Sequence, residues 1–218
     1  MSLQTITHTV NDILTWVKRQ FGDESGAQIT DADIIRWLNA AQLEVATLAD
    51  AIQAVSNSTL VAGTFQYAMP TENAIKIVSL TVDGLPVKAL EFQMANDLIA
   101  QEDPKRVATG TPYYYWRFAN QLYFYPTPDS AKPVALYYMA APAQVSTGTD
   151  ALGLPDKYFE ALVQYIMMKA YELDEDFSAM QTAKQAFSDR LGLGMEDDTR
   201  GSVEFYPTIT VLDDEDLY

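Results

Sequence analysis

The sequence of 218 residues contains no cysteine and a single histidine, His8. Without cysteine the chain supplies no disulfide bond, no thiol nucleophile and no thiolate ligand for zinc or an iron–sulfur cluster. One histidine also excludes a site in which several imidazoles of the chain hold a metal ion. No apolar run approaches the ~20 residues that a membrane-spanning helix needs, and no charged-then-apolar signal segment opens the chain. We therefore expect a soluble protein made inside the cell, with no membrane span.

Positive charge is also scarce. The chain carries 14 Lys and Arg residues against 30 Asp and Glu residues, a formal net charge of −16. This balance argues against a free-standing binder of nucleic-acid phosphates or anionic membranes, because both need basic residues. Apolar residues make up 48% and charged residues 20%, which is ordinary for a globular protein with one large domain or two small ones.

Helical periodicity marks the first part of the chain. Apolar residues between Val10 and Phe21 fall on one helical face, and Gly22 offers a stop. Thr30 is placed to cap a second helix, whose apolar positions follow one another in steps of four and three. Such a 3.5-residue period keeps a narrow stripe against a neighbouring helix and predicts a bundle. The stripe comprises Ile34, Leu38, Ala41, Val45, Leu48, Ile52 and Val55.

Between residues 59 and 145 the pattern changes to short β-type runs broken by Gly and Pro. Asp83-Gly84 is a turn dipeptide, and Ala119–Gln121 predicts a turn between two aromatic strands. We expect an antiparallel β-rich insertion here. The expected strands are Leu60–Met69, Ile75–Val82, Val87–Leu90, 113–118, Leu122–Tyr125 and Val134–Met139, with a short helix over Phe92–Ile99.

The segment Asp156–Leu191 predicts one long helix. Leu154-Pro155-Asp156 is typical of a helix start, and the apolar residues that follow are again spaced by four and three. Unbroken, these 36 residues would extend about 54 Å. Gly192 and Gly194 are expected to end the helix. Residues 196–218 follow, with eight acidic residues and one basic residue.

These patterns together predict an α+β fold, in which N-terminal helices and a long C-terminal helix form a bundle with an antiparallel β-rich insertion. We divide the chain accordingly. Residues 1–58 form the N-terminal helices of the bundle, 59–145 the β-rich insertion, 154–192 the long C-terminal bundle helix and 193–218 an acidic C-terminal extension.

Two groups of residues invite a chemical role, and neither is persuasive. His8 stands just before a helix with no sequence neighbour to orient it as a general base, so we expect a surface position without chemistry. Asp174, Glu175 and Asp176 resemble a cation-binding cluster, but adjacent residues of a helix point in different directions. We interpret them as a solvated helix face. We therefore assign no catalytic, cofactor-binding or metal-ligating residue and expect no enzyme; an enzyme with a site made of carboxylates alone ranks last.

The aromatic band Tyr113–Tyr125 has two interpretations. Alternation along a hairpin turns half of its rings inward as core and leaves half facing outward. If Tyr114 and Trp116 are exposed, they would stack on a glycan or anchor a protein ligand. The alternative function is therefore a non-enzymatic binding module, which Tyr114→Ala and Trp116→Ala would test through loss of ligand with the fold intact.

The acidic extension also contains apolar and β-branched residues between Val203 and Leu212, which disordered tails usually lack. A segment that is apolar in its middle and acidic at its end is typical of one that docks on a partner. The candidate partner-interface residues are Tyr114 and Trp116 in the aromatic band and Phe205, Tyr206, Ile209, Val211, Leu212 and Tyr218 in the extension.

Several short motifs follow one another in a fixed order over residues 30–191. They are Asp33-Ile34 with Leu38-Asn39-Ala40-Ala41-Gln42-Leu43-Glu44, Ala62-Gly63-Thr64 with Tyr67-Ala68-Met69-Pro70, Ile77-Val78 with Asp83-Gly84, Thr109-Gly110-Thr111-Pro112, Leu122–Pro128, Leu136-Tyr137-Tyr138 with Pro142, and Leu154-Pro155-Asp156 with Ala161-Leu162-Val163, Ala170-Tyr171 and Asp174-Glu175-Asp176. As an ordered set they resemble the adaptor, or head-to-tail connector, proteins of tailed bacteriophages.

The resemblance implies a structural virion protein, made in the host cytoplasm and located at the head–tail junction. Several copies, commonly twelve, form a ring below the portal protein, and the ring carries the tail or nozzle protein. DNA passes through the ring without specific binding, which suits a chain of net negative charge. No cofactor or membrane is implied. The chain alone need not oligomerise, because weak subunit contacts become effective once the portal holds neighbours in place.

Overall fold

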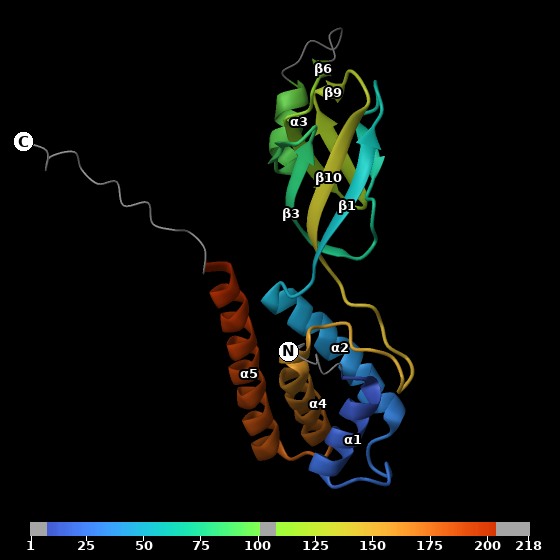
Figure 1. Ribbon diagram of the computed structural model, residues 1–218, viewed down its shortest axis with the longest axis vertical. Coiled ribbons are helices and arrows are strands. Elements are labelled where there is room, and N and C mark those ends of the chain that lie inside the picture. Colours follow the sequence, from blue (N-terminus) through green and yellow to red (C-terminus); the bar gives the residue numbers. More distant parts are fainter. Residues whose placement is uncertain (1–7, 101–107, 204–218) are drawn as a thin grey trace, which may run out of the picture.

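The computed structural model describes residues 8–100 and 108–203, with the backbone alone for 197–203. The chain is elongated, with a helical bundle at one end and a β-module, residues 53–140, at the other (Figure 1). The bundle is built from both ends of the chain, and the β-module is inserted between them, which confirms the expected α+β fold. The bundle elements are α1 (Val10–Phe21), α2 (Asp31–Ala49), the short 3-10 helix η1 (Asp156–Tyr158), α4 (Phe159–Leu173) and α5 (Phe177–Val203).

Local side-chain chemistry sets the ends of the first two helices. The Thr9 backbone N–H donates to the Asp12 carboxylate at 2.7 Å before α1, and Gly22 ends that helix with φ +84°. At the start of α2, the Asp33 backbone N–H donates to the Thr30 hydroxyl at 3.2 Å. The predicted starts of both helices are confirmed.

The second helix ends earlier than its apolar pattern extends. α2 stops at Ala49, Asp50 adopts φ +48°, and the chain enters a strand at Gln53. Leu48 and Val55 were expected in the bundle stripe but are about half exposed. The reason is that Ile52 packs against the cores of both the bundle and the β-module, so the chain changes period at this junction. The first four residues of the stripe are fully buried as expected: Ile34, Leu38, Ala41 and Val45.

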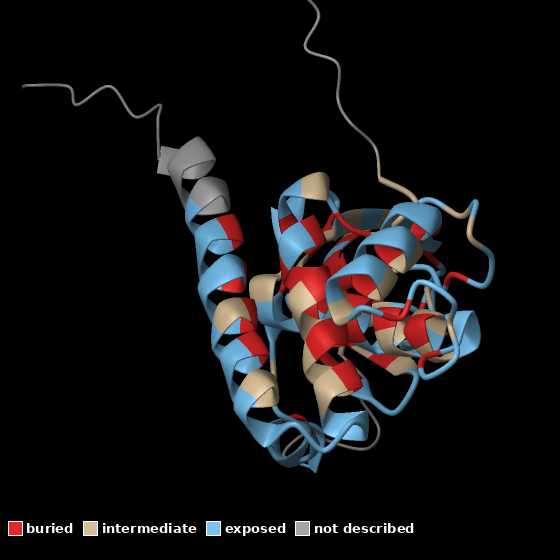
Figure 2. Ribbon diagram, turned by 90° about the horizontal axis from the view of Figure 1, so that it is seen from below, coloured by how far each residue is buried: buried red, intermediate tan, exposed pale blue. Residues whose placement is uncertain are grey.

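The single helix expected over residues 156–191 is wrong. The segment folds back on itself as a hairpin of α4 and α5, which lie side by side (Figure 2). Asp174 ends α4, Glu175 adopts φ +61°, and the Asp176 carboxylate accepts the backbone N–H of Ala179 at 3.0 Å to begin α5. The three acidic residues are therefore a turn rather than a helix face. The apolar spacing misled because each antiparallel helix keeps its own buried stripe.

The expected helix end at Gly192 and Gly194 is also wrong, since α5 continues to Val203. Gly194 lies against the fully buried ring of Tyr158, and a β-carbon at this position would come within 2.6 Å of the ring atom Cε1. A β-carbon on Gly192 would meet nothing within 4 Å. Gly194 therefore permits the close approach of α5 to η1, and it is not a stop signal.

α4 contributes more buried residues to the bundle than any other helix in the described part of the chain. α1 and α2 cover it on one side, and α5 covers it on another (Figure 2). The ring of Tyr165 on α4 meets Phe187 on α5 with centroids 5.5 Å apart. The buried apolar side chains of α4 are Phe159, Ala161, Leu162, Val163, Ile166, Met167 and Ala170, and those in the described part of α5 are Ala183, Phe187 and Leu191.

The β-module is a sandwich of two four-stranded sheets with a separate core. The first sheet has the order β1 (Gln53–Leu60), β10 (Lys132–Ala140), β3 (Ala74–Val82) and β4 (Leu85–Pro86). The second has the order β2 (Gln66–Ala68), β8 (Gln121–Tyr125), β7 (Tyr114–Phe118) and β5 (Lys88–Ala89). Helix α3 (Phe92–Ala100) packs near β7, and the short strands β6 (Thr109–Gly110) and β9 (Thr127–Pro128) form a separate pair. Leu80, Leu122 and Leu136 are among the residues that join the two sheets in one core.

Both predicted turns of the β-module are confirmed. Asp83 and Gly84 have φ of +53° and +77° between β3 and β4. Ala119 has φ +51° between β7 and β8, whose antiparallel register pairs Phe118 with Gln121.

Two expectations for the strands differ from the structure. The strand predicted over Leu60–Met69 is interrupted, because β1 ends at Leu60, Gly63 turns the chain with φ +77°, and β2 begins at Gln66. The strands are not all antiparallel, since β5 pairs with β7 and β6 with β9 in parallel. These parallel pairs are two residues long, so the antiparallel pattern still dominates.

Candidate interaction surfaces

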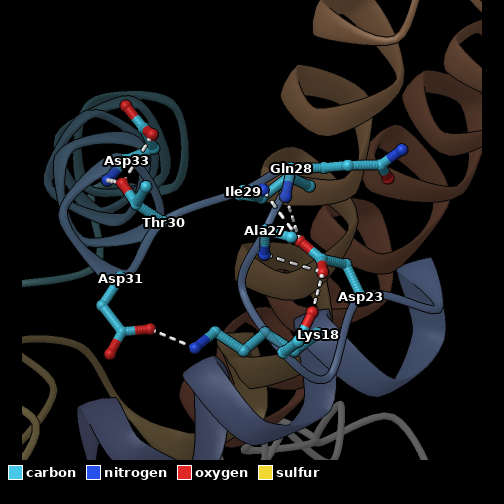
Figure 3. Close-up of polar contacts among 9 residues, drawn as sticks. Lys18, Asp23, Ala27, Gln28, Ile29, Thr30, Asp31 and Asp33 are labelled. Atoms are coloured by element: carbon cyan, nitrogen blue, oxygen red, sulfur yellow. Dashed lines mark hydrogen bonds and ion pairs between the residues drawn. The ribbon is translucent and has the colours of Figure 1, made fainter.

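One carboxylate fixes the loop between α1 and α2. The side chain of Asp23 accepts the backbone N–H groups of residues 27–29 at 2.9, 2.7 and 2.9 Å (Figure 3). These hydrogen bonds lower the pKa of Asp23 to about 2, and the bond from the Ile29 N–H has the largest effect. Lys18 forms an ion pair with Asp31 beside the same loop (Figure 3). Because its oxygens are saturated by the chain's own backbone, Asp23 holds the loop in place and is not free to act as a base or a metal ligand.

The segment that returns from the β-module to α4, residues 141–155, crosses α1 and α2 as a strap. Asn39 on α2 donates from Nδ2 to the Val145 carbonyl at 2.8 Å and accepts the Val145 N–H at 2.9 Å. Gln42, which is fully buried, accepts the Gly153 N–H at 2.6 Å. The sequence analysis did not predict that Asn39 and Gln42 hold the strap. The signal that could have revealed this was the presence of two polar residues within the apolar pattern of the helix.

His8 is oriented, contrary to the sequence-based expectation. Its ring stacks on Phe159 with centroids 4.0 Å apart, and its Nδ1 lies 3.2 Å from Oδ1 of Asp156. The backbone N–H of His8 donates to the same carboxylate oxygen at 3.2 Å. These contacts bind the segment before α1 to the start of α4, a structural role that explains why a half-buried histidine stands there.

The described residues hold no candidate metal centre. Among the side chains described, those of residues 8–100 and 108–196, no three of His, Asp or Glu gather closely enough to bind a metal ion. The acidic turn at Asp174–Asp176 belongs to this part of the chain. None of the helices described here has the length and apolar character that crossing a bilayer requires.

The aromatic band divides between core and surface. Trp116 is 4% exposed and stacks on Tyr123 with ring centroids 5.4 Å apart and planes 5° apart, so it is not the exposed platform that the binding-module hypothesis requires. Tyr114 is half-buried, and its ring meets that of Tyr113 at 64°. Tyr113 also meets Tyr125 nearly edge-on, at 83°. With Trp116 buried, the band lacks the exposed Trp that the glycan-binding hypothesis requires.

The other sequence-predicted interface residues lie outside the described part of the chain. They are Phe205, Tyr206, Ile209, Val211, Leu212 and Tyr218. In the sequence they follow Val203, the last residue of α5. Their role in partner binding stays a prediction.

The first sheet of the β-module presents an apolar outer face. Val55 on β1, Val78 on β3 and Tyr137 on β10 are 52%, 55% and 42% exposed and line one shallow groove. β1 forms the edge of this sheet and pairs with β10 along its full length, from Gln53 opposite Met139 to Leu60 opposite Lys132. Sequence analysis gave no signal for this surface, because it assigned Val55 to the buried stripe of a helix.

Comparison with known proteins places this two-part fold in a family. The sequence matches the SU10 adaptor protein family over residues 5–209, nearly the whole chain. The chain belongs to the SU10 adaptor protein family. This is a family of structural bacteriophage proteins and not a class of enzymes, and the resemblance found in the sequence is confirmed.

One solved structure similar to this SU10-family adaptor is a chain from the neck of an empty GTA particle computed with C6 symmetry. The two chains are 14% identical, with a TM-score of 0.24, and the match covers 76% of the adaptor and 82% of the neck chain. No curated protein matches the sequence.

Proposed function

We propose that this SU10-family adaptor is a subunit of the ring that lies below the portal protein, attaches the tail or nozzle protein and lets DNA pass. The observation that carries the proposal is the family match over residues 5–209. In the connectors that the sequence resembles, such a ring is commonly made of twelve copies. The adaptor would then reside in the virion, at the head–tail junction.

The shape of the subunit supports a role between two partners. The bundle and the β-module lie at opposite ends of an elongated molecule and have separate cores (Figure 1). One end can therefore bind the portal while the other binds the tail, without either contact disturbing the other. We include Tyr114 and the apolar residues of the extension, from Phe205 to Tyr218, among the proposed partner contacts.

The charge of the subunit supports the passage of DNA. At a net charge of −16 per copy, a ring of this chain repels phosphates and gives DNA few cationic sites to hold it. No sequence-specific DNA contact is proposed.

Deletion of the adaptor gene from the phage that encodes it tests this proposal. We expect DNA-filled heads without tails and free tails in the lysate, counted by electron microscopy, and restoration of infectivity when the intact gene is supplied in trans. Tailed, infectious particles in the absence of the gene would overturn the proposed function.

Removal of residues Gly201–Tyr218 tests the extension. We expect the truncated chain to keep its circular dichroism spectrum and cooperative unfolding, because the bundle core ends at Leu191, but to fail to attach to portal-bearing heads. Attachment equal to that of the full chain would show that the extension plays no part.

A further inference from the structure

The edge strand β1 lacks the features that normally protect a sheet edge. It has eight residues, none of them charged and none of them proline, and its register with β10 contains no bulge. The other edge strands of the two sheets, β4, β2 and β5, are two or three residues long, and β4 contains Pro86. An edge of this length and composition is a template for another strand.

The surroundings of β1 suit an apolar strand. Val55, Val78 and Tyr137 are the exposed apolar residues of a groove on the outer face of the sheet beside that edge, which Gln53, Ser79 and Thr81 also line. Within the described part of the chain, the backbone of β1 pairs with β10 alone. A strand added to β1 would complete its ladder and place alternate side chains on the same face of the sheet, beside this groove.

One segment of the chain fits this edge. Residues Thr208–Leu212 are consecutive β-branched or apolar residues, the composition most typical of strands. Pro207 lacks an N–H and therefore favours a strand that starts after it, and Asp213 begins a run of acidic residues that favours an end. Alternation would place Ile209 and Val211 on one face, so these two residues would extend the apolar face of the sheet.

The positions of the two features indicate a contact between copies. α5, which precedes this segment in the sequence, runs along the bundle at the left of Figure 1, whereas β1 lies in the β-module on the right-hand side of the first sheet, beyond β3 and β10. We propose that Thr208–Leu212 of one copy adds as a strand to β1 of the next copy. This proposal rests on the proposed ring. It makes the subunit contact head-to-tail, the type of contact that closes into rings.

Cysteine cross-linking tests this contact cleanly, because the natural chain has no cysteine. Phage particles are assembled with the double variant Asn57→Cys, Thr210→Cys and treated with a short bis-maleimide, whose reach tolerates the unknown register. We expect a ladder of covalent adaptor multimers on a denaturing gel, since each copy would be linked to the next. Asn57 is exposed on β1, so its replacement should not disturb folding.

Matched controls separate this contact from accidental proximity. Each single variant should give no ladder beyond a dimer. The pair Ser178→Cys, Thr210→Cys should give none either, because exposed Ser178 lies at the far end of α5, about 38 Å from Val203. In addition, Val55→Glu places a charge in the groove and should reduce ring assembly on the portal while leaving the unfolding transition of the isolated chain unchanged.

Three results would overturn the proposal while leaving the adaptor function intact. These are an absent cross-link or one confined to single chains, a cross-link from residue 210 to another virion protein instead of to the adaptor, and normal ring assembly of the Val55→Glu variant. A separate experiment tests the adaptor function itself. If phage that lack the adaptor gene still form tailed, infectious particles, the adaptor function is wrong.

Discussion

Gly192 and Gly194 stand two residues apart on α5 and meet different surroundings. Gly194→Ala would place a methyl group against the Tyr158 ring, which is fully buried and has no room to withdraw. We expect this variant to lose about 1–3 kcal/mol of unfolding free energy, as is typical of overpacking. Gly192→Ala meets no atom within 4 Å and should gain up to about 1 kcal/mol, since alanine favours helices. Urea denaturation of both variants measures the contrast, and an equal effect would contradict the packing argument.

A second prediction concerns the polar contact between Asn39 and the strap. Asn39→Ala leaves the N–H and carbonyl of Val145 without their partners and should cost about 1–3 kcal/mol of unfolding free energy. Arg36→Ala, one turn earlier on α2, removes an exposed ion pair with Asp33 and should cost about 0–1 kcal/mol. Thermal unfolding compares the two. Similar losses would mean that the strap does not depend on Asn39.

Asp23 and Asp150, which lie in two connecting segments of the bundle, should make its stability depend on pH in acid. Backbone hydrogen bonds lower the pKa of Asp23 to about 2 in the α1–α2 loop, and the pKa of Asp150 to about 2 in the strap, chiefly through the Ser146 N–H. Each carboxylate therefore stabilises the fold fully above its unfolded pKa near 3.8, and this contribution is lost as the pH falls toward 2.

We expect Asp23→Asn and Asp150→Asn each to be less stable than the natural chain at pH 7 and to lose less stability between pH 4 and pH 2. The double variant should show the shallowest acid slope. Chemical denaturation at a series of pH values gives these slopes. A slope as steep as that of the natural chain would show that other groups dominate acid unfolding.

The sequence predicted elements well where a local signal acts alone. The Thr30 cap, the Gly22 stop and the Asp83-Gly84 turn were all found because each depends on a few neighbouring residues. The sequence-based prediction failed where one helix and a hairpin of two helices have the same apolar pattern. The apolar residues remain spaced by four and three from α4 into α5, although α5 runs back along α4. The spacing of apolar residues therefore does not show that the chain reverses direction.

The surfaces were harder to predict than the elements. The sequence does not show whether the Trp116 ring is buried or exposed, because burial on that face of β7 depends on how the rest of the module packs. The exposed edge at β1 depends on strand order, which places β10 between β1 and β3. Both are tertiary facts that no alternation pattern contains.

The part of the subunit that the structure describes has two hydrophobic cores, one in each half, and Ile52 packs against both. We expect Leu80→Ala, at a fully buried site of the β-module, to cost about 2–5 kcal/mol and to speed amide exchange throughout that module. Ile166→Ala should do the same for the bundle. Hydrogen exchange with mass spectrometry reads the two halves separately. Equal acceleration in both halves for either variant would indicate one cooperative unit.

The insertion of the β-module between α2 and α4 also orders events during synthesis. α1 and α2 leave the ribosome first, but α4, which covers their apolar faces, follows more than a hundred residues later. At about 5–20 residues per second, roughly 5 to 20 s pass before the bundle can close, whereas the β-module needs nothing that comes after it. Closure of the bundle is therefore the last folding event. A prematurely terminated chain can form a β-module but cannot complete the bundle, so its exposed apolar helices mark it for chaperones and proteases before it can enter an assembly.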